Sequence, residues 1–276
     1  MKGYTDMKNY RLPLSKSIPF CNEKFYELLS EAKSLGFEAI DFDIAGAWST
    51  PDIEDEYFLH LEEGMAAVIE SGLPVNCIHI PFGDRWNPCL HDEDARRAVV
   101  EKFRAIIART APLKPLGYIV HGSFEPNFDD EREAKIAQLV KSMREMADAT
   151  DAYLCIEILP RTCLMNTAAE AKRIIEEIGI DNVRVCVDVN HFLQEKSEDG
   201  VLALGNLIVT THISDHDYEN ERHWMPGKGK INWNALIGAF EKIGYKGVFN
   251  YELGAPLADI KENYKILFDA YNASKD

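Results

Sequence analysis

Residues 183–188 read VRVCVD, a mostly apolar and β-branched run that ends in an aspartate. Five other apolar runs also end in a residue of a type that binds metals: VNCIHI with His79, GYIVH with His121, YLCIE with Glu157, LIVTTH with His212 and GVFNYE with Glu252. The intervals between these runs fit one β-strand, one helix and their loops. In a parallel barrel, the carboxyl ends of the strands meet at the face that carries the chemistry. The pattern therefore predicts one shared polar pocket at that face.

Strand-like and amphipathic stretches alternate along the whole chain, which predicts an α/β fold. The expected strands are residues 12–14, 37–44, 74–80, 116–121, 152–158, 183–189, 207–213 and 247–253. The expected helices are residues 22–35, 54–71, 92–111, 131–149, 167–178, a short one near Gly200, 234–243 and 259–271. Eight such units in 276 residues, without a linker or a break in composition, predict a single (β/α)8 TIM barrel domain over residues 1–276.

The composition argues against several classes of protein. The formal charge of −16 would repel a nucleic-acid backbone, so nucleic-acid binding is not expected. No apolar run approaches the roughly 18 residues of a membrane-spanning helix, and the first residues lack the apolar segment of a signal peptide. The six cysteines form no CxxC motif, so reduced thiols and a cytoplasmic location are expected.

Three of the cysteines lie beneath the predicted pocket. Cys77, Cys155 and Cys186 each precede a pocket residue by two positions, which places each pair on the same face of its strand. Packing one layer below the pocket is the expected role, and thiolate ligation of a metal is the alternative.

Glu157 and Glu252 carry the strongest chemical signal, because each is an acid between apolar neighbours. A buried carboxylate needs a cation, a metal ion or a proton. Asp188 lies in CVDVNHF, where His191 one turn later can face the same pocket. An imidazole such as that of His212, combined with three carboxylates, suits Mn²⁺, Co²⁺, Mg²⁺ or Zn²⁺. A structural salt bridge inside the barrel is the alternative to a metal site.

Other pocket assignments stay open at this level. His79 and His121 extend the metal cluster, bind substrate, or complete the polar end of the barrel. Asp41 and Asp43 face inward by alternation, so that one of them is expected near the pocket. Tryptophans in loops at the mouth stack on a sugar or pack at the rim, and the PGKGK turn binds phosphate or is simply solvated; these are Trp48, Trp86, Trp224 and residues 226–230.

The order Glu157, Asp188-x-x-His191, His212, PGKGK and Glu252 resembles the xylose isomerase-like barrel superfamily, and most of all its sugar and sugar-phosphate isomerases and epimerases. The resemblance covers nearly the whole chain and is most specific in the second half. It implies a small-molecule sugar or sugar-phosphate substrate, no membrane partner, and a chain that can form a homo-oligomer.

The resemblance also implies a mechanism and a set of site residues. One divalent metal, often Mn²⁺ with Co²⁺, Mg²⁺ or Zn²⁺ as alternatives, is expected at Glu157, Asp188, His212 and Glu252. Glu157 and Glu252 would be the acid/base pair that moves a proton next to the carbonyl through an enediolate. Substrate contacts are expected from His79, His121, His191, Arg222, His223, Trp48 and Trp86.

Three alternatives to an isomerase remain. The same barrel supports a metal-dependent dehydratase or lyase that acts on a cyclic hydroxy-ketone of the dehydroshikimate or inosose type. It also resembles abasic-site nucleases of the endonuclease IV type, whose three zinc ions would take His79, His121, Glu157, Asp188, His191, His212, Glu221, His223 and Glu252. The third alternative is a barrel that binds a sugar or a partner without turnover.

Overall fold

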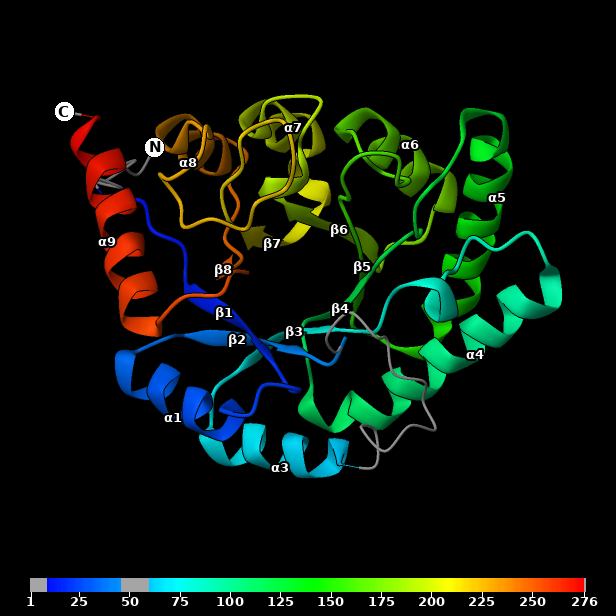
Figure 1. Cartoon of the computed structure of the whole chain (residues 1–276), viewed down its shortest axis with the longest axis horizontal. Coiled ribbons are helices and arrows are strands. Elements are labelled where there is room, and N and C mark those ends of the chain that lie inside the picture. Colours follow the sequence, from blue (N-terminus) through cyan, green and yellow to red (C-terminus); the bar gives the residue numbers. More distant parts are fainter. Residues whose placement is uncertain (1–8, 46–59, 276) are drawn as a thin grey trace, which may run out of the picture.

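The computed structural model describes residues 9–45 and 60–275. Its eight strands are all parallel, pair with their neighbours in chain order and close into a barrel in which the last strand pairs with the first. Helices surround the barrel as a ring (Figure 1). This architecture confirms the predicted (β/α)8 TIM barrel.

The strands are β1 Leu14–Pro19, β2 Ala39–Asp43, β3 Val75–His79, β4 Gly117–Val120, β5 Tyr153–Glu157, β6 Val183–Asp188, β7 Ile208–Ile213 and β8 Phe249–Tyr251. The α-helices are α1 Phe25–Leu35, α3 Leu61–Ser71, α4 Glu93–Thr110, α5 Asp129–Met146, α6 Ala168–Ile178, α7 Ser197–Leu204, α8 Trp233–Lys242 and α9 Leu257–Ala273. Most bounds agree with the prediction to within a few residues, and the first part of the helix expected over 54–71 lies outside the described residues. Within the described ranges, no helix has the length and apolar character needed to cross a membrane.

Local sequence signals place the helix ends. At α6, the Thr167 hydroxyl accepts a hydrogen bond from the backbone N–H of Glu170, which caps the first turn. The helix ends at Gly179, whose left-handed φ of 67° favours glycine. Between these ends Ile174, Ile178 and their neighbours on one face are buried against the barrel. The predicted helix therefore has the expected cap, stop and buried face.

The first strand differs from its prediction. It runs over Leu14–Pro19, whereas the sequence placed it at residues 12–14. The polar residues Ser15, Lys16 and Ser17 look unlike a strand core, yet all three are buried. Ser17 accepts a hydrogen bond from Asn250 Nδ2 at 2.9 Å on β8. The hydrogen bond from Asn250 on the neighbouring strand β8 satisfies Ser17, so this part of the strand is buried without the apolar pattern that the prediction required.

A small separate core lies among the strands beneath the pocket. It consists of Cys77, Cys155, Cys186 and Ile119, each fully buried, while the larger apolar core is a separate cluster. The three thiols are free, and burial raises the pKa of Cys77 and Cys186 well above the usual range. Neutral thiols of this kind pack as small apolar groups, as expected for the layer below the site.

Candidate metal centre

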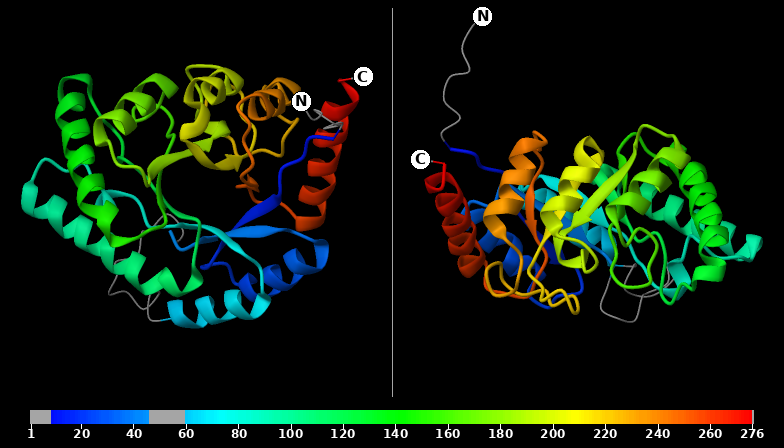
Figure 2. Two further views of the ribbon diagram at one scale, coloured as in Figure 1. Left: turned by 180° about the vertical axis from the view of Figure 1, so that it is seen from behind. Right: turned by 90° about the horizontal axis from the view of Figure 1, so that it is seen from above.

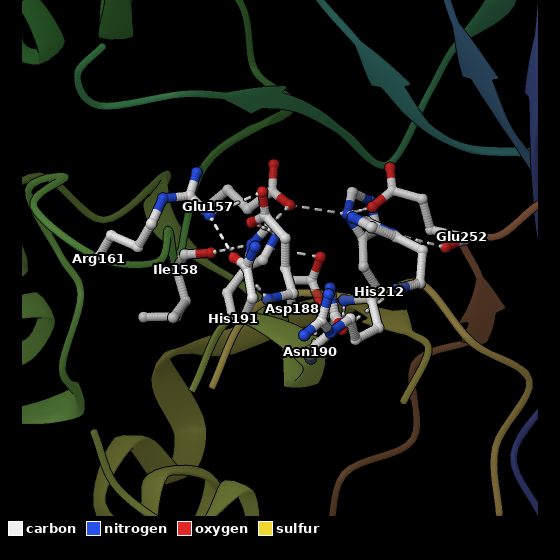
Figure 3. A network of polar contacts seen from close by, with 12 residues as sticks. Glu157, Ile158, Arg161, Asp188, Asn190, His191, His212 and Glu252 are labelled. Carbon is white, nitrogen blue, oxygen red and sulfur yellow. Dashed lines mark hydrogen bonds and ion pairs between the residues drawn. The ribbon is translucent and has the colours of Figure 1, made fainter. Parts of the chain in front are cut away.

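Four strand ends bring the predicted metal ligands together. β5 ends at Glu157, β6 ends at Asp188, His212 is the next-to-last residue of β7, and Glu252 directly follows β8. One ligand atom from each of the four lies within 4.8 Å of all the others. These side chains converge in Figure 3, although they come from four different strands of the second half of the chain. The parallel barrel produces this convergence, because it gathers the carboxyl ends of its strands at one face.

The centre is buried, and its donor atoms are oxygen and nitrogen. Glu157 is 1% exposed, and Asp188 and His212 are fully buried. His212 Nδ1 lies 3.0 Å from Glu157 Oε1 and 3.0 Å from Glu252 Oε2. Three carboxylates and one imidazole form a set that binds divalent cations of the Mg²⁺, Mn²⁺ or Zn²⁺ type.

One buried oxygen in this centre supports the fit of a metal ion. Asp188 Oδ2 has no hydrogen-bond partner among the described residues. His191 Nδ1 lies 3.3 Å from it but donates instead to the carbonyl oxygen of Ile158 at 2.8 Å. A buried carboxylate oxygen without a donor is costly, and a bound cation would remove that cost. The residues present therefore fit a divalent metal.

The charges of the four groups influence one another. Burial raises the pKa of Asp188 to about 6, with His191 acting in the opposite direction. Burial also opposes ionisation of Glu157 and Glu252, but the neighbouring His212 holds the pKa of both carboxyls below the usual range. Both glutamates are therefore ionised near neutral pH, as metal ligands and as proton acceptors must be.

Two histidines from the first half of the barrel contact Glu157. His79 Nε2 lies 3.3 Å and His121 Nε2 lies 2.9 Å from Glu157 Oε2. The Phe82 ring stacks on His121 with centroids 4.1 Å apart. Ligand atoms of His79, His121 and Glu157 also lie within 4.8 Å of one another. Both histidines therefore line the pocket, at positions suited either to substrate contact or to a larger metal cluster.

Asp41 lies behind the histidine ligand. Its carboxylate is fully buried and lies 3.5 Å from His212 Nε2, on the far side of the ring from Glu157. Asp41 also accepts hydrogen bonds from Asn76 Nδ2, the Cys77 backbone N–H and Asn250 Nδ2 at 2.6–3.0 Å. A carboxylate in this place orients a metal-binding imidazole. Of the two inward-facing aspartates, Asp41 is thus the one that contacts a predicted ligand.

The loop after β7 folds over the mouth beside His191. Glu221 Oε2 lies 3.3 Å from His191 Nε2, and His223 Nδ1 donates to the Glu252 carbonyl at 3.1 Å. Arg222 forms a 2.7 Å contact with Asp217 and lies over the Trp224 ring. Figure 2 shows this loop (gold) at the same end of the barrel as the loop after β5. His191 and His223 therefore border the centre, while the Arg222 side chain is held by its own loop.

The expected substrate contact of Trp86 needs correction, and the structure bears on the alternatives left open for the PGKGK turn. Trp86 is 1% exposed and packs on Phe103 with ring centroids 5.5 Å apart, so its indole belongs to the core and offers no face to a sugar. In the PGKGK turn, the Gly227 N–H donates to Asp215 Oδ2 at 2.8 Å, so this amide is not available to a phosphate. Trp48 lies outside the described residues.

Sequence reasoning missed two cationic residues near the centre. Lys16 on β1 is 8% exposed and donates to the Ser17 carbonyl. Burial lowers the pKa of Lys16 to about 8, although the negative charges of Glu252 and of the β2 aspartates act to raise it. Lys16 was not predicted because the first strand was expected to end at residue 14. Arg161, in the loop after β5, pairs with Glu221 at 2.9 Å. No local pattern marks that residue, because its partner is distant in sequence.

Comparison with known proteins identifies a matching family and several relatives. The family model described as xylose isomerase-like TIM barrel matches residues 29–271. D-psicose 3-epimerase of Enterocloster bolteae is 23% identical over 83% of this chain and 75% of the relative. Inosose isomerase of Bacillus licheniformis is 27% identical over 63% of this chain and 65% of the relative. The solved structure of a D-tagatose 3-epimerase-like protein, 19% identical, matches with a TM-score of 0.80 over 96% of this chain and 100% of that one, which shows the same fold.

Proposed function

The chain belongs to the xylose isomerase-like TIM barrel family, and on that basis we propose that it is a divalent-metal-dependent isomerase or epimerase of a sugar or sugar phosphate. The observation that carries this proposal is the convergence of Glu157, Asp188, His212 and Glu252 within 4.8 Å at the carboxyl end of the barrel. Relatives named as a psicose epimerase and an inosose isomerase support the reaction class.

The four converging residues would hold the metal, with Mn²⁺ favoured and Co²⁺, Mg²⁺ or Zn²⁺ as alternatives. The ion would supply positive charge that polarises the carbonyl group of the sugar. The burial of Glu157, Asp188 and His212 would strengthen that electrostatic effect, because solvent screens buried charges less.

Glu157 and Glu252 would move the proton. They reach the pocket from β5 and from the end of β8, so that a sugar placed between them meets a carboxylate on each side. One carboxylate oxygen removes the proton next to the carbonyl and produces an enediolate; the other glutamate, or the same one, returns a proton. Return to the opposite face gives an epimer, and return to the neighbouring carbon gives an isomer.

The histidines would hold and orient the sugar. His79, His121 and His191 border the centre with at least one ring nitrogen each near a carboxylate of the site. Their N–H groups can donate to sugar hydroxyl and carbonyl oxygens. His223 and Arg222 are candidates for the outer end of the substrate, since both belong to the loop that covers the mouth.

Solvent exchange tests this function before the sugar itself is identified. The protein is loaded with Mn²⁺ and incubated in D₂O with ketohexoses, ketopentoses, their phosphates and inososes, and each mixture is followed by NMR. We expect deuterium at the carbon next to the carbonyl, together with a new epimer or aldose. Products that have lost water would instead assign the dehydratase reaction, and the absence of exchange with every substrate would contradict both.

A nuclease of the endonuclease IV type is the second candidate. Ligand atoms also gather in the groups His79–His121–Glu157 and His191–Glu221–His223, as a cluster of three zinc ions requires. The formal charge of −16 weighs against a DNA substrate. Cleavage of an abasic oligonucleotide by the zinc-loaded protein, with a steep dependence on salt, would favour this candidate.

A further inference from the structure

Arg161 connects three loops at the mouth of the barrel through hydrogen bonds and ion pairs. Arg161, after β5, donates from Nε and Nη2 to Glu125 Oε1 after β4, at 3.0 and 2.6 Å. Its Nη1 donates to Asn220 Oδ1 at 3.0 Å and pairs with Glu221 Oε1 at 2.9 Å, both in the loop after β7. In Figure 3, Arg161 lies at one end of the polar network and Glu252 at the other. Arg161 therefore belongs to the rim of the site.

Glu221 also belongs to a second group of metal-ligand type. Its Oε2 lies 3.3 Å from His191 Nε2, and ligand atoms of Glu221, His191 and His223 lie within 4.8 Å of one another. Two imidazoles and a carboxylate are a common ligand set for zinc. The carboxylate of Glu221 is nevertheless engaged by Arg161, whose guanidinium stays protonated at all accessible pH values.

We infer that Arg161 keeps a second metal ion out of the His191–Glu221–His223 group. A fixed positive charge beside one ligand repels an incoming divalent cation. Arg161 also engages Oε1 of Glu221, which leaves only Oε2, the oxygen that faces His191, for an ion. The Nδ1–H of His191 donates to the Ile158 carbonyl, so Nε2 is the ring nitrogen that a second ion would take and that its exclusion leaves for a substrate. Arg161 thus limits the site to one metal ion, although further side chains of metal-ligand type lie beside it.

Metal stoichiometry in matched variants tests this role. Arg161→Gln removes the charge and keeps a hydrogen-bonding side chain, whereas Arg161→Lys keeps the charge at the same backbone position. Ions per chain are measured by plasma mass spectrometry after dialysis, and stepwise affinities by calorimetric titration with Zn²⁺ and Mn²⁺. Circular dichroism of each variant establishes that it is folded.

We expect one ion in the wild-type protein and in Arg161→Lys. Arg161→Gln should take up a second Zn²⁺ with an affinity at least about tenfold above any second step of the wild type. The double variant Arg161→Gln/Glu221→Gln should lose that second ion, which would locate it at Glu221. Equal second-ion binding by the wild type and Arg161→Gln, or no second ion in a folded Arg161→Gln protein, would overturn the inference.

This test is separate from that of the proposed function. If the wild-type protein bound no ion, the metal-dependent reaction would be contradicted. The comparison of Arg161→Gln with Arg161→Gln/Glu221→Gln would still test the role of Arg161. An additional ion in Arg161→Gln that is missing from the double variant would support the role of Arg161. The same ion content in both variants would contradict it.

Discussion

The two halves of the barrel contribute different chemistry to the same pocket. β5 to β8 supply the four converging residues, of which three are carboxylates. β2 to β4 supply Asp41, His79 and His121, and each of these contacts one of the four: Asp41 lies against His212, and both histidines lie against Glu157. Under the proposed function, the second half would hold the metal, while the first half supplies side chains that contact the groups that do so.

Removal of a carboxylate from the second half should have the largest effect. Glu157→Gln and Glu252→Gln keep the size of the side chain but cannot accept a proton, so turnover of the identified sugar should be lost, by about a hundredfold or more. The loss is measured as kcat on folded, metal-loaded protein. Glu133→Gln, at an exposed carboxylate of α5 that pairs with Arg173, is the matched control and should keep full activity. Near wild-type activity in either pocket variant would disprove the two-glutamate mechanism.

A change in the first half should weaken the metal without removing it. Asp41→Asn removes the charge behind His212, so that the imidazole is a poorer and less well oriented ligand. Metal affinity should fall by about ten- to a hundredfold, measured by competition with a chromophoric chelator. An unchanged affinity would restrict Asp41 to its hydrogen bonds with Asn76 and Asn250.

The pH dependence of metal binding should report on Asp188. Burial raises the pKa of this carboxyl to about 6, so that below pH 6 an incoming ion must displace its proton, and above pH 6 it need not. The logarithm of the metal affinity should therefore fall more steeply with decreasing pH below about pH 6, by about one additional decade per pH unit. Calorimetric titrations between about pH 5 and 8 measure the slope. A single constant slope across this range would contradict the raised pKa.

The smallest effect on the metal is expected from the histidines of the first half. In a centre with one ion, His79→Gln and His121→Gln should each leave the number of ions per chain unchanged, while the KM for the sugar rises because a donor is lost. Plasma mass spectrometry gives the metal content and steady-state kinetics give the KM. Loss of metal in both variants would instead assign these residues to a larger cluster.

The strand-end pattern predicted, for a physical reason, which side chains lie together at the carboxyl end of the barrel. A strand buried on both faces is a continuous apolar run, so an acid or histidine at its end is conspicuous in the sequence. His79, Glu157, Asp188 and His212 are all of this kind. The first strand lacks the signal, because Ser15, Lys16 and Ser17 are polar residues that are buried in the folded barrel.

Residues in loops were predicted less well. Trp86 follows β3 and was expected at the mouth. It is instead the last residue of a short helical turn, Asp84–Trp86, and its ring packs on Phe103 within the core. Spacing along the chain places a loop at the correct end of the barrel, yet it does not say which of its side chains faces the pocket.

The sequence by itself determined the alternation of strands and helices, the end of the barrel that carries the polar residues, and the six strand-end residues that include the four converging groups, because each depends on local periodicity. Only the tertiary structure decided which distant groups meet. The pairing of Arg161 with Glu221 and the place of Asp41 behind His212 join different strands or loops, and the hydrogen bond from the Gly227 N–H to Asp215 spans the loop after β7. Such contacts depend on barrel closure and loop packing, and no local pattern in the chain records them.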